Sequence, residues 1–186
     1  NEIEFISSNA FMYCDVTKLE LNEYDNAYYI GNDDNPSLIL YKAKSTDVAS
    51  CIIHKDTKLI SDRAFYGCTN LADSVQVVIP DSVTTIGEAT FNGCKSLESI
   101  TLSSSIKKID RKLFEGCSSL VDIRIPSGVT EIGWNAFKNC TSLEVLFLPE
   151  SVIDVGPMIC EGCPSITIYL EKENQLVKNA NDLRKQ

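Results

Sequence analysis

Apolar residues recur along the chain with a period of 23 residues. The stretches 83–105, 106–128 and 129–151 align without gaps, and each places Ile, Phe, Cys and Leu at the same offsets. A fixed period between about 20 and 30 residues is the signature of a solenoid, in which each repeat forms one coil. One coil cannot bury its apolar side alone. The repeated positions therefore predict a continuous core shared by neighbouring coils.

Four ladders of apolar residues define the predicted core. The phenylalanine and cysteine ladders are Phe65, Phe91, Phe114 and Phe137, and Cys68, Cys94, Cys117, Cys140 and Cys163. The leucine and isoleucine ladders are Leu71, Leu97, Leu120, Leu143 and Ile166, and Ile60, Ile86, Ile109, Ile132 and Val155. We expect these side chains to be buried and the ladder cysteines to be reduced, because a buried free Cys behaves as a small hydrophobic residue.

Each repeat predicts a short helical turn followed by a short strand. The residue after the ladder isoleucine is Ser, Gly or Asp, which are helix N-cap types. The residue before the ladder cysteine is Gly or Asn, which can close a helix in the left-handed conformation. An alternating run such as 99–102 follows the ladder leucine and predicts a strand, which ends at Pro80, Pro126 or Pro149 in three copies.

The combined pattern I-G-x-x-A-F-x-x-C-x-x-L-x-x-I-x-I-P-x-x-V resembles the BspA-like, or treponemal-type, leucine-rich repeat over about residues 57–170. The resemblance implies an α/β right-handed leucine-rich-repeat solenoid with a parallel sheet on one side. It also implies a secreted or cell-surface protein, often bacterial, that acts in adhesion and binds host proteins. These functional expectations come from the family and not from the periodicity.

The chain of 186 residues is long enough for one domain, and the regular repeats occupy residues 57–170 of it. Residues 3–21 are interpreted as a degenerate first repeat. Residues 22–56 break the period with two strand-like runs, which predict an inserted β-hairpin and a return strand. Residues 171–186 are expected to form a C-terminal cap. The chain opens inside a repeat without an initiator Met, so we expect a processed or truncated piece of a longer protein.

The formal net charge of -9 narrows the range of partners. Residues 1–50 contain nine acidic residues against three lysines, and an acidic chain argues against nucleic acid or an anionic membrane as a partner. No apolar run approaches the roughly 20 residues of a spanning helix, so membrane insertion of this segment is not expected. One basic cluster is either a solvated face or a site for an acidic partner: Lys107, Lys108, Arg111 and Lys112.

The sequence contains no motif that predicts an enzyme, a cofactor site or a metal site. It lacks the G-x-S-x-G, H-E-x-x-H and phosphate-loop patterns, and its single histidine, His54, has no partner signature and is expected at the surface. Cys160-x-x-Cys163 has redox or zinc spacing. However, both cysteines fall on ladder positions and zinc needs four ligands. Structural thiols are therefore favoured over a local disulfide or a metal.

Outward strand positions carry the candidate binding residues. Val78, Thr101, Arg124 and Phe147 share one offset, and Tyr169 lies near it in the last copy, where the alternation is expected to slip by one residue. Arg, Phe and Tyr are residue types of protein-binding hot spots. We therefore interpret the chain as a noncatalytic protein-binding or adhesion module with Arg124, Phe147 and Tyr169 at its contact site. Its partner would be a protein, such as a host or extracellular-matrix protein. The alternative is a structural spacer within a larger surface protein.

Overall fold

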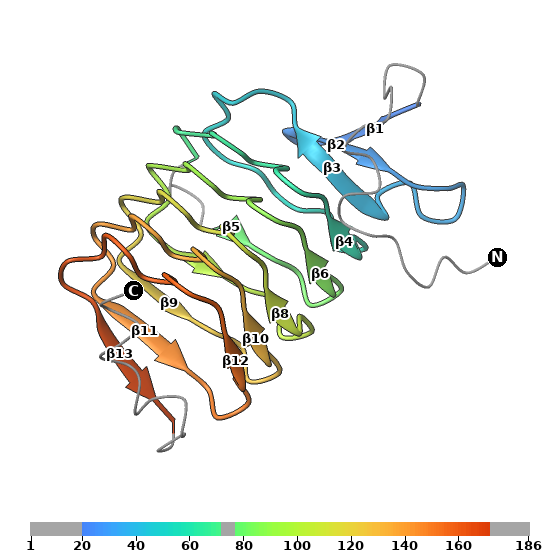
Figure 1. Cartoon of the computed structure of the whole chain (residues 1–186). Helices are drawn as coiled ribbons and strands as arrows, with labels where there is room; N and C mark the ends of the chain where they lie inside the picture. The colour runs from blue at the N-terminus through green and yellow to red at the C-terminus, as the bar shows by residue number, and fades with distance from the viewer. Residues whose placement is uncertain (1–19, 72–76, 172–186) are drawn as a thin grey trace.

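The computed structural model describes residues 20–71 and 77–171. In this part of the chain, successive coils stack side by side along one axis, with the N-terminal strands at one end and β12 and β13 at the other (Figure 1). The predicted first repeat and the predicted C-terminal cap lie outside the described residues, apart from residues 20, 21 and 171. The structure therefore reports on the regular repeats and on the segment that precedes them.

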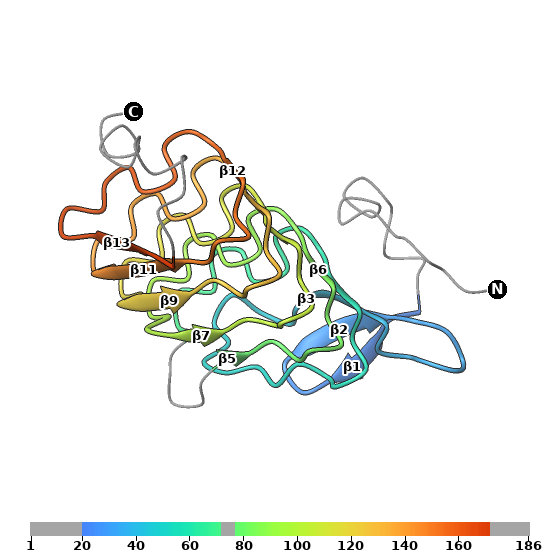
Figure 2. The ribbon, with the colours of Figure 1, turned by 90° about the horizontal axis from the view of Figure 1, so that it is seen from below.

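Each regular coil contributes one short strand to each of two sides of the solenoid. On the isoleucine side these strands are β4 (Leu59–Ile60), β6 (Thr85–Ile86), β8 (Lys108–Ile109), β10 (Glu131–Ile132) and β12 (Asp154–Val155). On the other side they are β5 (Val77–Val78), β7 (Ile100–Thr101), β9 (Asp122–Arg124), β11 (Val145–Leu148) and β13 (Thr167–Leu170), which follow one another in Figure 2. Hydrogen-bonded pairs between these strands are parallel. The solenoid thus has two strand-bearing sides, where the family resemblance implied one.

The predicted short helical turns are wrong, because the described residues contain no helix. Consecutive turns join the two strands of each coil, and two residues in each of these segments have positive φ. The first set is Arg63, Ala89, Lys112, Asn135 and Met158, and the second is Gly67, Gly93, Gly116, Asn139 and Gly162. A right-handed helix needs an unbroken run of residues with negative φ. A left-handed residue every few positions therefore prevents one from forming.

Backbone groups in these turns bond to the neighbouring coil instead of within a helix. The N–H of Phe114 donates to the carbonyl oxygen of Ala136 at 2.8 Å, and the N–H of Gly116 donates to that of Lys138 at 2.7 Å. The same pattern recurs from coil to coil. In a helix these N–H groups would donate to carbonyls four residues earlier in their own coil. The backbone N–H and C=O groups of the turn segments therefore form hydrogen bonds between coils, and these bonds connect each coil to its neighbour.

The four core ladders are confirmed, with Val155 half-buried at the last coil and the other described members buried. The rings of Phe65, Phe91, Phe114 and Phe137 stack nearly parallel, with centroid separations of 5.3, 5.6 and 5.6 Å. The ladder thiols also donate hydrogen bonds across the stack. Cys140 Sγ, for example, lies 3.0 Å from the carbonyl oxygen of Phe114 in the preceding coil. The described cysteines are buried and form no disulfide with one another.

An antiparallel meander precedes the regular coils. It consists of β1 (Asn22–Tyr24), β2 (Ala27–Ile30) and β3 (Ile39–Ala43), and β3 then pairs in parallel with β4. The side chains of Tyr29 and Leu40 are 0% exposed, so the meander covers the first coil of the core. Cys51 and Ile53 are buried while Ile52 is exposed, which keeps strand-like alternation although no strand is assigned there. Whether this meander interrupts the solenoid stays a prediction, since residues 3–19 are not described.

Candidate protein-binding surface

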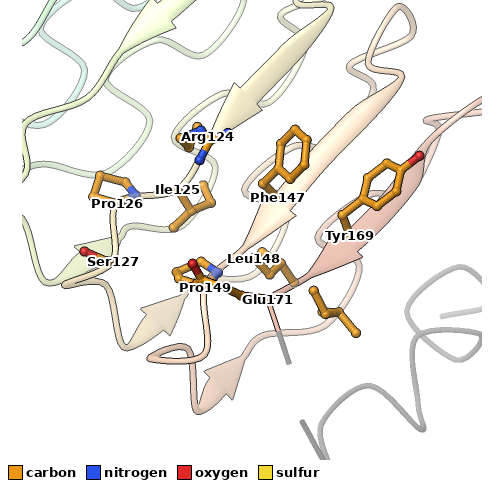
Figure 3. Close-up of a pocket in the computed structure, with 10 residues that line it drawn as sticks. Arg124, Ile125, Pro126, Ser127, Phe147, Leu148, Pro149, Tyr169 and Glu171 are labelled. Atoms are coloured by element: carbon orange, nitrogen blue, oxygen red, sulfur yellow. The ribbon is translucent and has the colours of Figure 1, made fainter. Parts of the chain in front are cut away.

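The predicted outward residues lie in register on the side of the solenoid that carries β5 to β13. Val78 pairs with Thr101 across β5 and β7. Arg124, Phe147 and Tyr169 face one another across β9, β11 and β13. We call these last three the Arg–Phe–Tyr row. Figure 3 shows their side chains next to one another on three neighbouring strands.

Tyr169 lies one residue earlier than the 23-residue period would place it, which is the slip expected for the last copy. Ile166 follows Leu143 by 23 residues, whereas Thr167 is the register partner of Val145, 22 residues earlier. The last coil therefore reaches its strand one residue sooner, and the difference is absorbed before β13 begins. Within β13 the alternation is regular, and Tyr169 is 51% exposed in line with Phe147.

The Arg–Phe–Tyr row is a continuous stack. The guanidinium carbon of Arg124 lies 5.1 Å from the centroid of the Phe147 ring, which is the geometry of a cation–π contact. On its other face, Phe147 stacks on Tyr169 with a centroid separation of 5.3 Å and an angle of 21° between the ring planes. Phe147 is nevertheless 40% exposed. The row holds three large side chains in a fixed arrangement at the surface, on strands that the core ladders position.

A groove runs beside this row at the ends of the strands. Its volume is about 450 Å³, and Pro126, Ser127, Pro149 and Glu171 contribute to its wall together with the three residues of the row. Figure 3 shows the two prolines below Arg124 and Phe147, where β9 and β11 end. A surface that is largely apolar, aromatic and lightly charged fits contact with another protein better than catalysis.

Three of the four residues in the basic cluster at positions 107–112 contact side chains of neighbouring coils. Lys108 pairs with Glu131 at 2.8 Å, and Arg111 pairs with Glu88 at 2.6 Å. The ammonium group of Lys112 lies 4.6 Å from the centroid of the Trp134 ring. These contacts connect neighbouring coils, as expected for a solvated face; whether the cluster also binds an acidic partner stays a prediction.

The other candidate residues do not assemble into a chemical site. Cys160 and Cys163 are buried at the last coil, and no group of three or more potential metal ligands occurs within residues 20–71 and 77–171. The half-buried ring of His54 packs edge-on against Tyr24 at 4.8 Å, and its Nδ1 accepts a hydrogen bond from the N–H of Asp56 at 3.3 Å. No helix in the described part of the chain is long and apolar enough to span a bilayer.

Stacked parallel coils with repeated leucine and isoleucine positions define this protein as a leucine-rich-repeat solenoid. A family model described as the BspA type leucine rich repeat region matches residues 41–167 in six copies. The chain belongs to this family. The match begins inside the segment 22–56 that the sequence pattern assigned to an insertion and a return strand.

Solved structures of bacterial leucine-rich-repeat proteins resemble the chain. A leucine rich cell surface protein from Faecalibacterium prausnitzii is 28% identical with a TM-score of 0.75, and the alignment covers 89% of this chain and 42% of that one. The T. pallidum leucine rich repeat protein TpLRR is 26% identical with a TM-score of 0.69, covering 80% of this chain and 71% of that one. This chain thus spans about two fifths of the Faecalibacterium protein. A search of curated protein sequences gave no match.

Proposed function

We propose that this chain is a noncatalytic protein-binding module of a bacterial surface protein, and that the Arg–Phe–Tyr row is its contact site in adhesion. The observation that carries the proposal is the exposed stack of Arg124, Phe147 and Tyr169 on three hydrogen-bonded strands. The surface location is supported by the similar Faecalibacterium protein, which is described as a cell surface protein.

The geometry favours binding because the row is ordered before a partner arrives. A binding surface loses affinity when association has to immobilise its side chains, at about 0.5–1.5 kcal/mol for each rotamer-rich side chain. Here Phe147 is already held between Arg124 and Tyr169. The exposed area of both rings remains available for burial, which contributes roughly 25 cal/mol for each Å² removed from water.

A triple variant, Arg124→Ala with Phe147→Ser and Tyr169→Ser, is expected to lose partner binding. A hot-spot side chain contributes about 2 kcal/mol or more, so the loss of even one of the three should lower affinity about 30-fold, and the triple variant should lose at least that much. The assay is capture of proteins from extracellular-matrix and host-cell preparations by the immobilised full chain. Each partner that the wild type retains is then titrated against both proteins.

The matched control changes the same kinds of residue on the turn side: Arg63→Ala, Tyr66→Ser and Trp134→Ser, all three exposed. This control should retain every partner, and both variants should melt as cooperatively as the wild type. If the folded triple variant keeps all partners, this row is not the binding site. If the wild type captures nothing, a structural spacer role is the better interpretation.

A further inference from the structure

A second groove lies on the turn segments of the first three regular coils, and we call it the turn-side groove. Its volume is about 550 Å³. It is lined by two cations, Arg63 and Lys112, by the ring of Tyr66, and by the polar side chains of Asn92 and Glu115. Pockets that hold small-molecule ligands have volumes of roughly 300–1,000 Å³, so the turn-side groove has the size of a ligand site.

The two cations of the turn-side groove occupy one offset of the repeat, two coils apart. Ala89 takes this offset in the coil between them, and its short side chain leaves room between the two longer ones. Neighbouring coils are about 4.8 Å apart, so the backbones of Arg63 and Lys112 lie roughly 10 Å from each other. In the described part of the chain, neither cation has a carboxylate within salt-bridge distance. The groove therefore presents two positive charges to an anionic ligand.

The polar and aromatic side chains of the groove suit a ligand rich in hydroxyl groups. Asn92 Nδ2 donates to Glu115 Oε2 at 3.1 Å, which leaves the second amide hydrogen, the amide oxygen and further carboxylate lone pairs available. A sugar hydroxyl both donates and accepts, so it can use both kinds of group. Tyr66 is 52% exposed, and its negative ring face can pack against the C–H groups of a sugar ring.

The backbone of the groove is already used between coils. The N–H groups of Arg63, Ala89 and Lys112 donate to carbonyl oxygens of the next coil, at 2.9, 3.1 and 3.0 Å. Those of Gly93 and Gly116 do the same at 2.8 and 2.7 Å. An extended peptide that adds to a protein surface draws its affinity from main-chain hydrogen bonds. Recognition through side chains, which this groove offers, favours a saccharide over a peptide.

We infer that the turn-side groove binds a short acidic saccharide, in which two linked sugar rings each carry a carboxylate. One carboxylate pairs with Arg63 and the other with Lys112, while the hydroxyls bond to Asn92 and Glu115 and one ring stacks on Tyr66. Glu115 opposes an anion, yet the two cations outweigh its single charge. The inference goes beyond the proposed function, because the Arg–Phe–Tyr row lies on the strands and not on the turn segments.

The test is a titration of the isotope-labelled full chain with digalacturonic acid, followed by NMR. The amide signals of residues 63–67, 89–93 and 112–116 are expected to shift most, since these segments line the groove. The dimethyl ester of the same disaccharide keeps both rings and carries no charge. It should bind about tenfold more weakly, because it cannot form the two ion pairs.

The double variant Arg63→Gln with Lys112→Gln should weaken digalacturonic acid binding about tenfold, since each exposed ion pair contributes up to about fivefold. The matched control is Lys58→Gln with Lys107→Gln. These lysines are exposed, share one offset two coils apart and directly precede β4 and β8 on the isoleucine side. The control removes the same charge and should leave the affinity unchanged.

Ala89→Met tests the shape of the groove without changing its charge. The last coil has Met158 at this offset with a φ of 57°, against 53° at Ala89, so the backbone conformation accepts Met. The longer side chain fills the space between the two cations. Binding of digalacturonic acid should be lost while the melting temperature stays close to that of the wild type.

Five results would overturn the inference. They are the absence of wild-type binding at about 5 mM digalacturonic acid; equal binding of the dimethyl ester; equal weakening by the two double variants; unchanged binding by a folded Ala89→Met variant; and tighter binding of the capped peptide acetyl-Glu-Ser-Glu-amide, which would assign the groove to an acidic protein segment.

The proposed function is judged separately. Protein capture by the wild type and its variants is repeated with digalacturonic acid present at about 5 mM, which releases any glycoprotein held in the turn-side groove. The triple variant then reports on the Arg–Phe–Tyr row alone. A captured partner with no saccharide binding would sink this inference and leave the proposed function standing, and the reverse result would do the opposite.

Discussion

Phe114→Ala is expected to lower the free energy of unfolding by about 3–5 kcal/mol. Phe114 is 0% exposed, and its ring stacks between Phe91 and Phe137 at centroid separations of 5.6 Å on both sides. Truncation removes both contacts and leaves a cavity. The neighbouring coils cannot collapse into it freely, because hydrogen bonds such as Phe114 N–H to the carbonyl oxygen of Ala136 fix their spacing.

Thermal unfolding followed by circular dichroism measures this effect. For a domain of this size, the loss corresponds to a fall of about 6–20 °C in the melting temperature. Phe147→Ala is the matched control, since it makes the same truncation at a side chain that is 40% exposed. The control should shift the melting temperature far less. Equal effects of the two variants would contradict the assignment of the phenylalanine ladder to the core.

Raising the pH from 9 to 10 is expected to lower the free energy of unfolding by about 5 kcal/mol, through five buried thiols. Burial raises the pKa of Cys68 to about 11 and that of Cys51 to about 12. Burial also raises the pKa of Cys94, Cys117 and Cys140. Above about pH 8.5 the unfolded thiols lose their protons while the native thiols keep them. The native state then binds more protons, so stability is full below the unfolded pKa and falls as pH rises.

Urea unfolding at pH 7.5, 9 and 10, with reductant present, measures how the free energy of unfolding depends on pH. Each thiol contributes about 1 kcal/mol between pH 9 and 10. The combined variant Cys94→Ala, Cys117→Ala and Cys140→Ala should be less stable at pH 7.5, yet should lose about three fifths of the pH dependence. Cys163 is not counted, because a hydrogen bond with Cys160 lowers its pKa. A urea midpoint that does not change between pH 7.5 and 10 would contradict the burial of protonated thiols.

The core could be predicted from the sequence because stacking requires an apolar residue at the same offset in every coil. A side chain at the offset of Phe114 or Cys117 meets its own counterpart from the neighbouring coil, so each copy must place an apolar residue there. The structure buries both residues completely. The hydrogen bonds from the ladder thiols to phenylalanine carbonyls were not predicted, since a Cys at a ladder offset is equally consistent with simple packing.

The turn segments could not be predicted, because residue types at their ends are ambiguous. Asp110 and Gly116 suit the two ends of a short helix, yet they also suit consecutive turns. The decisive feature is positive φ at residues such as Ala89, Lys112 and Met158, whose types do not favour that conformation. Backbone hydrogen bonds to the next coil stabilise these turn conformations. The residue pattern of a single repeat does not reveal those hydrogen bonds.

The outward row was predicted in part. The offset that places Arg124 and Phe147 outward follows from strand alternation, and the structure places both there. The one-residue slip at Tyr169 was also expected, and Tyr169 is the register partner of Phe147, 22 residues later. The stacking of Arg124 on Phe147 depends on side-chain direction, which the pattern of outward positions leaves open.

Hydroxyl-radical footprinting of the chain with a partner that it captures tests the central claim most directly. The method reads side-chain exposure, and it is most sensitive to aromatic and sulfur-containing residues. If the Arg–Phe–Tyr row is the contact site, oxidation of Phe147 and Tyr169 should fall strongly in the complex, while Tyr66 and Trp134 on the turn side should react as in the free chain. Unchanged oxidation of Phe147 and Tyr169, with protection of Tyr66 and Trp134 instead, would contradict it.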